Sequence, residues 1–296
     1  MRTLPAPAAV TERRPQEGVP RIAVAARGAE RLTAAWLRLA VGGLVAAGLF
    51  ALLVAVARTP VVQAAMGPES FRVALVAHVA FSLNVWTLSV VAALWVLVPA
   101  RCGAAPVLPL GWSGLGLAVA GAALMALSSL AAPGTPALVD YLPLLDHPVF
   151  RAGLGAFLGG VALAAVGHLV ALARAPRPLG PEATALRLSA AAYLAALATL
   201  AAVGVARLAA DYASLAWGPG HMLQAVNTGA LVAAWLLLRR TPLGPRRRAL
   251  LRALLPLLLL PAVGVPLLYV LPLPDPLALM GGVTWAATGV VGATAW

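Results

Sequence analysis

The feature that most constrains this chain is a succession of apolar runs, each about 20 residues long, that fills the sequence from residue 36 onward. A helix of roughly 20 residues crosses the ~30 Å hydrocarbon core of a bilayer. The runs are rich in Leu, Ala and Val and lack the ~10-residue alternation typical of barrel strands. Because backbone polar groups within lipid must pair internally, the pattern predicts an all-α, polytopic membrane helical bundle.

Composition supports the same class, since 62% of the residues are hydrophobic and only 10% are charged. Soluble domains are closer to half apolar and a quarter charged. We predict about eight transmembrane helices, at residues 36–57, 71–98, 110–131, 149–173, 185–208, 217–238, 250–271 and 277–296.

The formal charge of +12 comes from arginine alone, because the chain has no lysine. If the N-terminus is cytoplasmic, only Arg58, Arg72, Arg151 and Arg207 of the 21 arginines fall on outer segments. That asymmetry follows the positive-inside rule. The charge therefore indicates topology and lipid contact, and no nucleic-acid partner is expected.

Residues 1–33 are rich in Pro, Arg and Ala, and they predict a mobile cytoplasmic tail ahead of a transmembrane domain at 34–296. The first apolar run has the length of a span, which differs from a cleavable secretory signal. We expect a multi-pass protein of the bacterial inner membrane. Cys102 is the only cysteine, so no intrachain disulfide is possible.

The predicted sixth span opens with Trp217-Gly-Pro-Gly-His221 and carries Gln224 and Thr228 three and seven residues after the histidine. At helical spacing these three polar residues share one face. Ionisable residues inside a span are costly and usually face the interior of a bundle. His221 is therefore the first candidate for a ligand-binding residue.

A second histidine, His78, lies in the predicted second span, which runs in the same direction as the sixth. Helical rise places His78 about 10 Å and His221 about 6 Å below the outer ends of their spans, in the same leaflet. Two imidazoles at one depth could hold a haem or a metal. The alternative is that each ring bonds a backbone carbonyl or a nearby side chain, such as Ser82 for His78.

Other candidate residues have simpler interpretations. His147 is interpreted as a solvated loop residue beside Asp146, and His168 as a snorkelling or packing residue at the opposite leaflet. Arg72, Arg151 and Arg207 could bind haem propionates, or else lipid head groups, Asp146 or Asp211. Arg207 and Asp211 are spaced to pair.

Two backbone patterns also predict structure. Gly155 and Gly159 form a Gly-xxx-Gly pattern that predicts a close helix contact. Pro256, Pro261 and Pro266 predict a bent seventh span.

The two histidine segments together resemble subunit I of the haem–copper oxidase superfamily. Arg72, His78, Phe81 and Trp86 are similar to the helix that carries a low-spin haem histidine in that family. Trp217-Gly-Pro-Gly-His221 resembles the start of its sixth helix, whose histidine binds the active-site copper. The resemblance implies haem b as cofactor, bound by His78, His221 and Arg72, and other respiratory-complex subunits or a cytochrome c-like donor as partners.

The chain also departs from that family. Residues 248–271 contain no histidine, where the family has a His-His pair for copper, and Ala225 stands at the place of a tyrosine found in many members. The family's tenth helix has no counterpart among the eight predicted spans. Copper is therefore not expected, no catalytic residue is assigned, and the chain alone is not expected to reduce oxygen or nitric oxide.

The sequence thus predicts a haem-binding membrane protein that takes part in respiratory electron transfer and resembles an incomplete oxidase subunit I. Two alternatives stay open. The first is a cofactor-free membrane scaffold or assembly factor with structural histidines. The second is a transporter of a small solute or copper, with His78, His221 and Gln224 lining the path, which the prolines of the seventh span favour.

Overall fold

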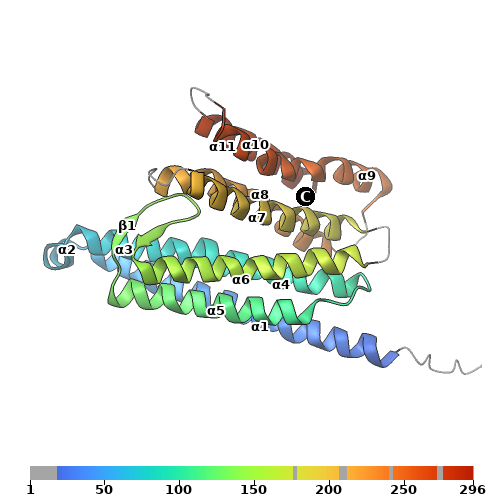
Figure 1. Ribbon diagram of the computed structural model, residues 1–296, viewed down its shortest axis with the longest axis horizontal. Coiled ribbons are helices and arrows are strands. Elements are labelled where there is room, and N and C mark those ends of the chain that lie inside the picture. The colour runs from blue at the N-terminus through green and yellow to red at the C-terminus, as the bar shows by residue number, and fades with distance from the viewer. Residues whose placement is uncertain (1–18, 176–178, 207–211, 240–242, 272–275, 296) are drawn as a thin grey trace, which may run out of the picture.

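A computed structural model describes residues 19–175, 179–206, 212–239, 243–271 and 276–295. Helices dominate these residues, and antiparallel neighbours pack side by side along a common long axis (Figure 1). The α-helices are α1 (Val19–Ala57), α2 (Pro60–Met66), α3 (Pro68–Val79), α4 (Thr87–Arg101), α5 (Leu108–Ala131), α6 (Pro148–Ala173), α7 (Pro181–Ala206), α8 (Tyr212–Leu238), α9 (Pro245–Leu254), α10 (Leu260–Leu268) and α11 (Pro276–Ala295).

Seven segments among the described residues are long and apolar enough to cross a membrane: Arg27–Ala57, Glu69–Arg101, Leu108–Ala131, Pro148–Ala173, Pro181–Gly204, Tyr212–Leu238 and Pro245–Leu268. The chain is therefore a multi-pass membrane protein built as a helical bundle, as predicted. The predicted eighth span coincides with α11, which is a 20-residue helix. Both the total of eight and the cytoplasmic N-terminus stay predictions.

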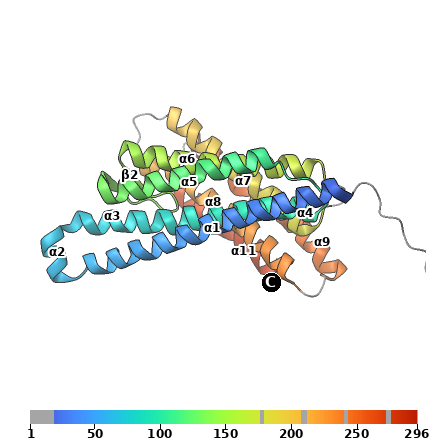
Figure 2. The same ribbon diagram turned by 90° about the horizontal axis from the view of Figure 1, so that it is seen from below.

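The packing order places α1 against α3 and α4, then α4 against α6, and α7 against α8, with α10 and α11 covering α8. Figure 2 shows α1 and α3 lying side by side and joined through α2. Along α1, Trp36, Ala47 and Phe50 are buried. Val45 and Leu49 on the opposite side are more than half exposed, as expected for a face in contact with lipid.

Several local predictions need correction. Helix α1 starts at Val19, so residues 19–33 of the predicted tail are helical, and residues 1–18 lie outside the described residues. The predicted outer loop 132–148 contains an antiparallel hairpin, with β1 (Thr135–Ala137) paired to β2 (Leu144–Asp146). The predicted second span also contains a π-helical segment, η1 (Ala80–Trp86).

The predicted bend of the seventh span is confirmed. Helix α9 ends at Leu254, a 3₁₀ segment η2 (Leu255–Leu259) follows, and α10 resumes at Leu260. Pro256 lies within the 3₁₀ segment and Pro261 in the first turn of α10, and neither has the N–H that would continue the preceding α-helix.

The prediction for Gly155 and Gly159 is wrong. A Cβ at Gly155 would meet no atom within 4 Å, and one at Gly159 would make only ordinary contact with Leu117. The close contact between α5 and α6 is made instead by two glycine pairs. A Cβ at Gly114 would lie 2.5 Å from the carbonyl oxygen of Gly160, and one at Gly121 would lie 2.5 Å from that of Gly153. Each helix repeats glycine after seven residues, and this spacing keeps both glycines on one face.

Candidate cofactor site

The Trp-Gly-Pro-Gly-His segment lies in the first turns of α8, and the Tyr269 hydroxyl bonds main-chain groups beside Pro219. Pro219 has no N–H to donate to the carbonyl of Leu215, four residues earlier. The Tyr269 hydroxyl lies 3.2 Å from that carbonyl oxygen and 3.1 Å from that of Ser214, and it accepts from the Gly218 N–H at 3.1 Å. A Cβ at Gly218 would lie 2.7 Å from the hydroxyl, so glycine makes room for it.

The loop between β1 and β2 covers the same turns of α8. Figure 1 shows this loop, in green, extending from the α5–α6 pair to the beginning of α8. The Tyr212 hydroxyl donates to the carbonyl of Leu142 at 2.9 Å. A Cβ at Gly220 would lie 2.7 Å from the carbonyl oxygen of Asp140, so the second glycine admits the loop backbone. Tyr141 has a left-handed φ of 68°, an uncommon conformation for a residue with a side chain.

His221 lies beneath this loop and is only 6% exposed. Its ring stacks on Trp217 with 3.7 Å between ring centroids, and the Tyr141 ring meets it edge-on at 4.9 Å. The Gln224 amide donates to the Tyr141 hydroxyl. His221 and Gln224 therefore share one face of α8, as predicted, and that face meets Tyr141.

The hydrogen bond of His221 fixes its tautomer. Nδ1 lies 2.8 Å from the carbonyl oxygen of Trp217. A carbonyl can only accept, so Nδ1 carries the proton and Nε2 keeps its lone pair.

His78 makes the same kind of bond in a different place. Its Nδ1 lies 2.9 Å from the carbonyl oxygen of Ala47 in α1, so Nε2 again keeps the lone pair. The ring is half-buried, at the end of α3 and directly before η1. Ser82 is not its partner, because the Ser82 hydroxyl donates to the carbonyl of Val79 at 3.3 Å.

The structure does not join the two candidate ligands directly. His78 bonds to α1, whereas His221 contacts its own helix and the β1–β2 loop. Both residues are described, and neither a hydrogen bond nor a ring contact connects them. A single haem held by both rings therefore stays a prediction.

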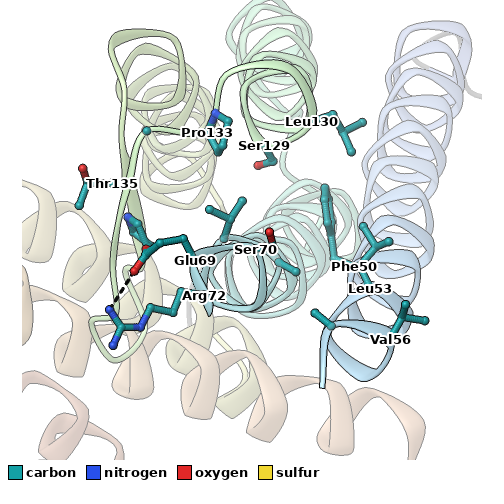
Figure 3. Close-up of a pocket in the computed structure, with 15 residues that line it drawn as sticks. Phe50, Leu53, Val56, Glu69, Ser70, Arg72, Ser129, Leu130, Pro133 and Thr135 are labelled. Atoms are coloured by element: carbon teal, nitrogen blue, oxygen red, sulfur yellow. Dashed lines mark hydrogen bonds and ion pairs between the residues drawn. The ribbon is translucent and has the colours of Figure 1, made fainter. Parts of the chain in front are cut away.

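Arg72, the third predicted ligand, lines a cavity of about 620 Å³ between α1, α3 and the end of α5 (Figure 3). Its guanidinium pairs with the Glu69 carboxylate at 3.3 Å. Neither His78 nor His221 lines this cavity. Arg151 pairs with Asp146 at 2.5 Å, one of the partners considered for it in the sequence. Arg207 and Asp211 lie outside the described residues.

The remaining histidines, His147 and His168, each form hydrogen bonds within the protein. His147 is not merely a solvated loop residue, because its Nδ1 accepts from the Val149 N–H at 3.3 Å and caps α6. His168 is 2% exposed, so it packs and does not snorkel. Its Nδ1 lies 2.8 Å from the carbonyl oxygen of Trp95.

A metal-ion site and a haem site need different numbers of protein ligands. In the described part of the chain, no three His, Cys, Asp or Glu side chains gather in a way that could hold a metal ion. A haem iron needs only one or two axial ligands from the protein. Histidines that bind metals usually donate their second ring N–H to a carbonyl or carboxylate, as His78 and His221 do.

Three polar residues in this region were missed in the sequence. Tyr141 and Tyr269 join α8 only through tertiary contacts, so spacing along the chain gives no signal for them. Asn84 did carry a signal, since it is a lone amide in an apolar run. It is fully buried within η1, with neither side-chain amide atom bonded. Buried polar atoms normally have partners, and π-helical segments are frequent at functional sites. The η1 segment is therefore a second candidate for a functional region.

Comparison with known proteins adds one distant relative. No protein-family model matches the chain. An uncharacterised protein of Aquifex aeolicus is 31% identical over 212 residues, which cover 69% of this chain and 53% of that protein. The chain thus spans about half the length of the relative that it matches. The class established here is a multi-pass helical membrane protein, and its function is the subject of the proposal that follows.

Proposed function

We propose that this membrane protein binds haem b through His78 and takes part in respiratory electron transfer. The observation that carries the proposal is the bond from His78 Nδ1 to the Ala47 carbonyl, which leaves the Nε2 lone pair free to bind iron. The ring is also half-buried inside a predicted span, where an ionisable group without a task is uncommon.

The protein's own groups would orient the ligand. The Ala47 carbonyl fixes both the tautomer and the rotation of the His78 ring. Haem iron, when bound, supplies a centre that accepts and returns one electron. His221 has the same tautomer and is the candidate for a second axial ligand or a separate site. Arg72 is one candidate among the outer arginines for pairing with a propionate.

The test is a reduced-minus-oxidised optical spectrum of the purified full chain. The expected result is a haem b signal that His78→Ala abolishes. His168→Ala is the matched control, because His168 also bonds a backbone carbonyl through Nδ1 but lies near the other end of its span. In His78→Gly, added imidazole should restore the signal, since imidazole can replace an axial ligand and cannot correct a folding defect.

Other outcomes of this experiment would favour a different function or a different axial ligand. A colourless but folded protein would favour the scaffold alternative. Copper bound without haem would favour metal handling. Loss of the signal in His221→Ala alone would move the axial ligand from α3 to α8.

A further inference from the structure

The cavity that contains Arg72 lies at one end of the bundle, where two segments long and apolar enough to cross a membrane end and begin. Phe50, Leu53 and Val56 come from the last two turns of α1, and Glu69 and Arg72 from the beginning of α3. The two membrane-spanning segments end and begin here, at Ala57 and Glu69. The volume of about 620 Å³ lies within the usual range of ligand sites, about 300–1,000 Å³.

The lining of the cavity is of two kinds, which lie on opposite sides of the beginning of α3. Figure 3 shows the Glu69–Arg72 pair at one side and Phe50, Leu53 and Val56 at the other. Glu69 and Arg72 are 61% and 57% exposed, so their ion pair is open to exchange with a ligand. Leu53 and Val56 are about half exposed, and they continue the apolar face of α1 that includes Leu49.

The opposite charges of Arg72 and Glu69 indicate which head group the cavity can bind. A phosphate ester is a good partner for a guanidinium, and a primary ammonium is a good partner for a carboxylate. A ligand with both groups a few ångströms apart could bond Arg72 and Glu69 together and leave neither charge unpaired. An anionic lipid without an ammonium would satisfy Arg72 but place its negative charge beside Glu69.

We propose that this cavity binds a zwitterionic phospholipid of the phosphatidylethanolamine type. Its phosphate bonds Arg72, its ammonium bonds Glu69, and the upper part of its acyl chains lies along Phe50, Leu53 and Val56. Neither His78 nor His221 lines this cavity, so lipid binding can be measured on the haem-free protein.

The experiment is native mass spectrometry of the full chain after reconstitution with equal amounts of phosphatidylethanolamine and phosphatidylglycerol. Phosphatidylethanolamine should be retained preferentially. Arg72→Gln and Glu69→Gln should each weaken its retention roughly tenfold, the effect of losing one charge-assisted hydrogen bond. The matched control is Arg151→Gln, which breaks a pair of similar exposure, Arg151–Asp146, outside the cavity and should retain the lipid.

A second variant covers the case in which a charge substitution disturbs folding. Leu53→Trp narrows the apolar part of the cavity, keeps both charges, and alters a side chain that is already 46% exposed. It should melt like the unmodified protein and lose the lipid. Equal retention of the two lipids, or unchanged retention in both Arg72→Gln and Leu53→Trp, would overturn the proposal.

Discussion

The surroundings of His78 and His221 differ, although both rings make the same bond. Each donates from Nδ1 to a main-chain carbonyl, that of Ala47 for His78 and that of Trp217 for His221. His78 is half-buried, whereas His221 is 6% exposed and touches the rings of Trp217 and Tyr141. His221 and His78 therefore differ in how much each contributes to packing, which the sequence could not show. His221 packs against two aromatic rings in addition to its hydrogen bond, whereas a hydrogen bond to Ala47 is the interaction that holds His78.

The largest expected effect tests this contrast directly. His221→Ala removes a hydrogen bond and two ring contacts from a buried position and should destabilise the haem-free protein by about 2–4 kcal/mol. His78→Ala should cost only about 0.5–1.5 kcal/mol, the value of one hydrogen bond. Thermal unfolding in detergent measures both. Equal losses for the two variants would contradict the assigned difference.

A smaller effect concerns the fit between α8 and the β1–β2 loop. Gly220→Ala places a methyl group 2.7 Å from the carbonyl oxygen of Asp140, so the loop must shift, at a cost of about 1–3 kcal/mol. Gly42→Ala in α1 is the matched control, because its new methyl group would meet no atom within 4 Å. Thermal unfolding should separate the two variants, and a Gly220→Ala protein as stable as Gly42→Ala would show that the loop does not contact α8.

Tyr141→Phe tests the same contact between the β1–β2 loop and α8 with a more conservative change. It keeps the ring against His221 but removes the hydroxyl that accepts from Gln224. A partly buried amide then loses its partner, and stability should fall by about 1–2 kcal/mol. Gln224→Leu combined with Tyr141→Phe removes both polar groups and should recover part of the loss. A double-mutant cycle in the same unfolding assay measures this coupling, and zero coupling energy would contradict the bond.

The smallest expected effect is on the pH dependence of Cys102 alkylation, and Cys102 lies outside the candidate spans. Burial raises the pKa of the Cys102 thiol, and the Glu182 carboxylate raises it further. Because the thiolate is the reactive form, alkylation by iodoacetamide should begin at higher pH than for a free cysteine. Glu182→Gln should move the profile toward lower pH without changing stability. An identical profile for the two proteins would remove Glu182 as a cause.

The part of the fold that could be predicted is the part that depends on length and hydrophobicity. Apolar runs of about 20 residues must become spanning helices in lipid, and prolines favour an interruption of the kind seen at η2. The glycine contact between α5 and α6 could not be assigned this way. The sequence offers both Gly155–Gly159 and the Gly153–Gly160 repeat on one helix, and only the rotation of α6 against α5 selects the second.

The candidate site divides in the same manner. Spacing along α8 placed His221 and Gln224 on one face, because helical geometry is local. Their partners, Tyr141 from the hairpin loop and Tyr269 from the end of α10, come from residues 83 and 51 positions away from Gln224 and Gly218. Residue spacing within a single helix cannot predict contacts between segments so far apart in the sequence.

The sequence by itself therefore determined the membrane class, most helix boundaries and the shared face of His221 and Gln224, because these follow from hydrophobic length and local spacing. Tertiary structure alone decided which carbonyl each histidine bonds, which ring packs against it, and that Arg72 faces Glu69 in a separate cavity. The physical reason is that such contacts depend on how helices rotate and dock against one another, and these choices are set by many weak contacts distributed over the whole bundle.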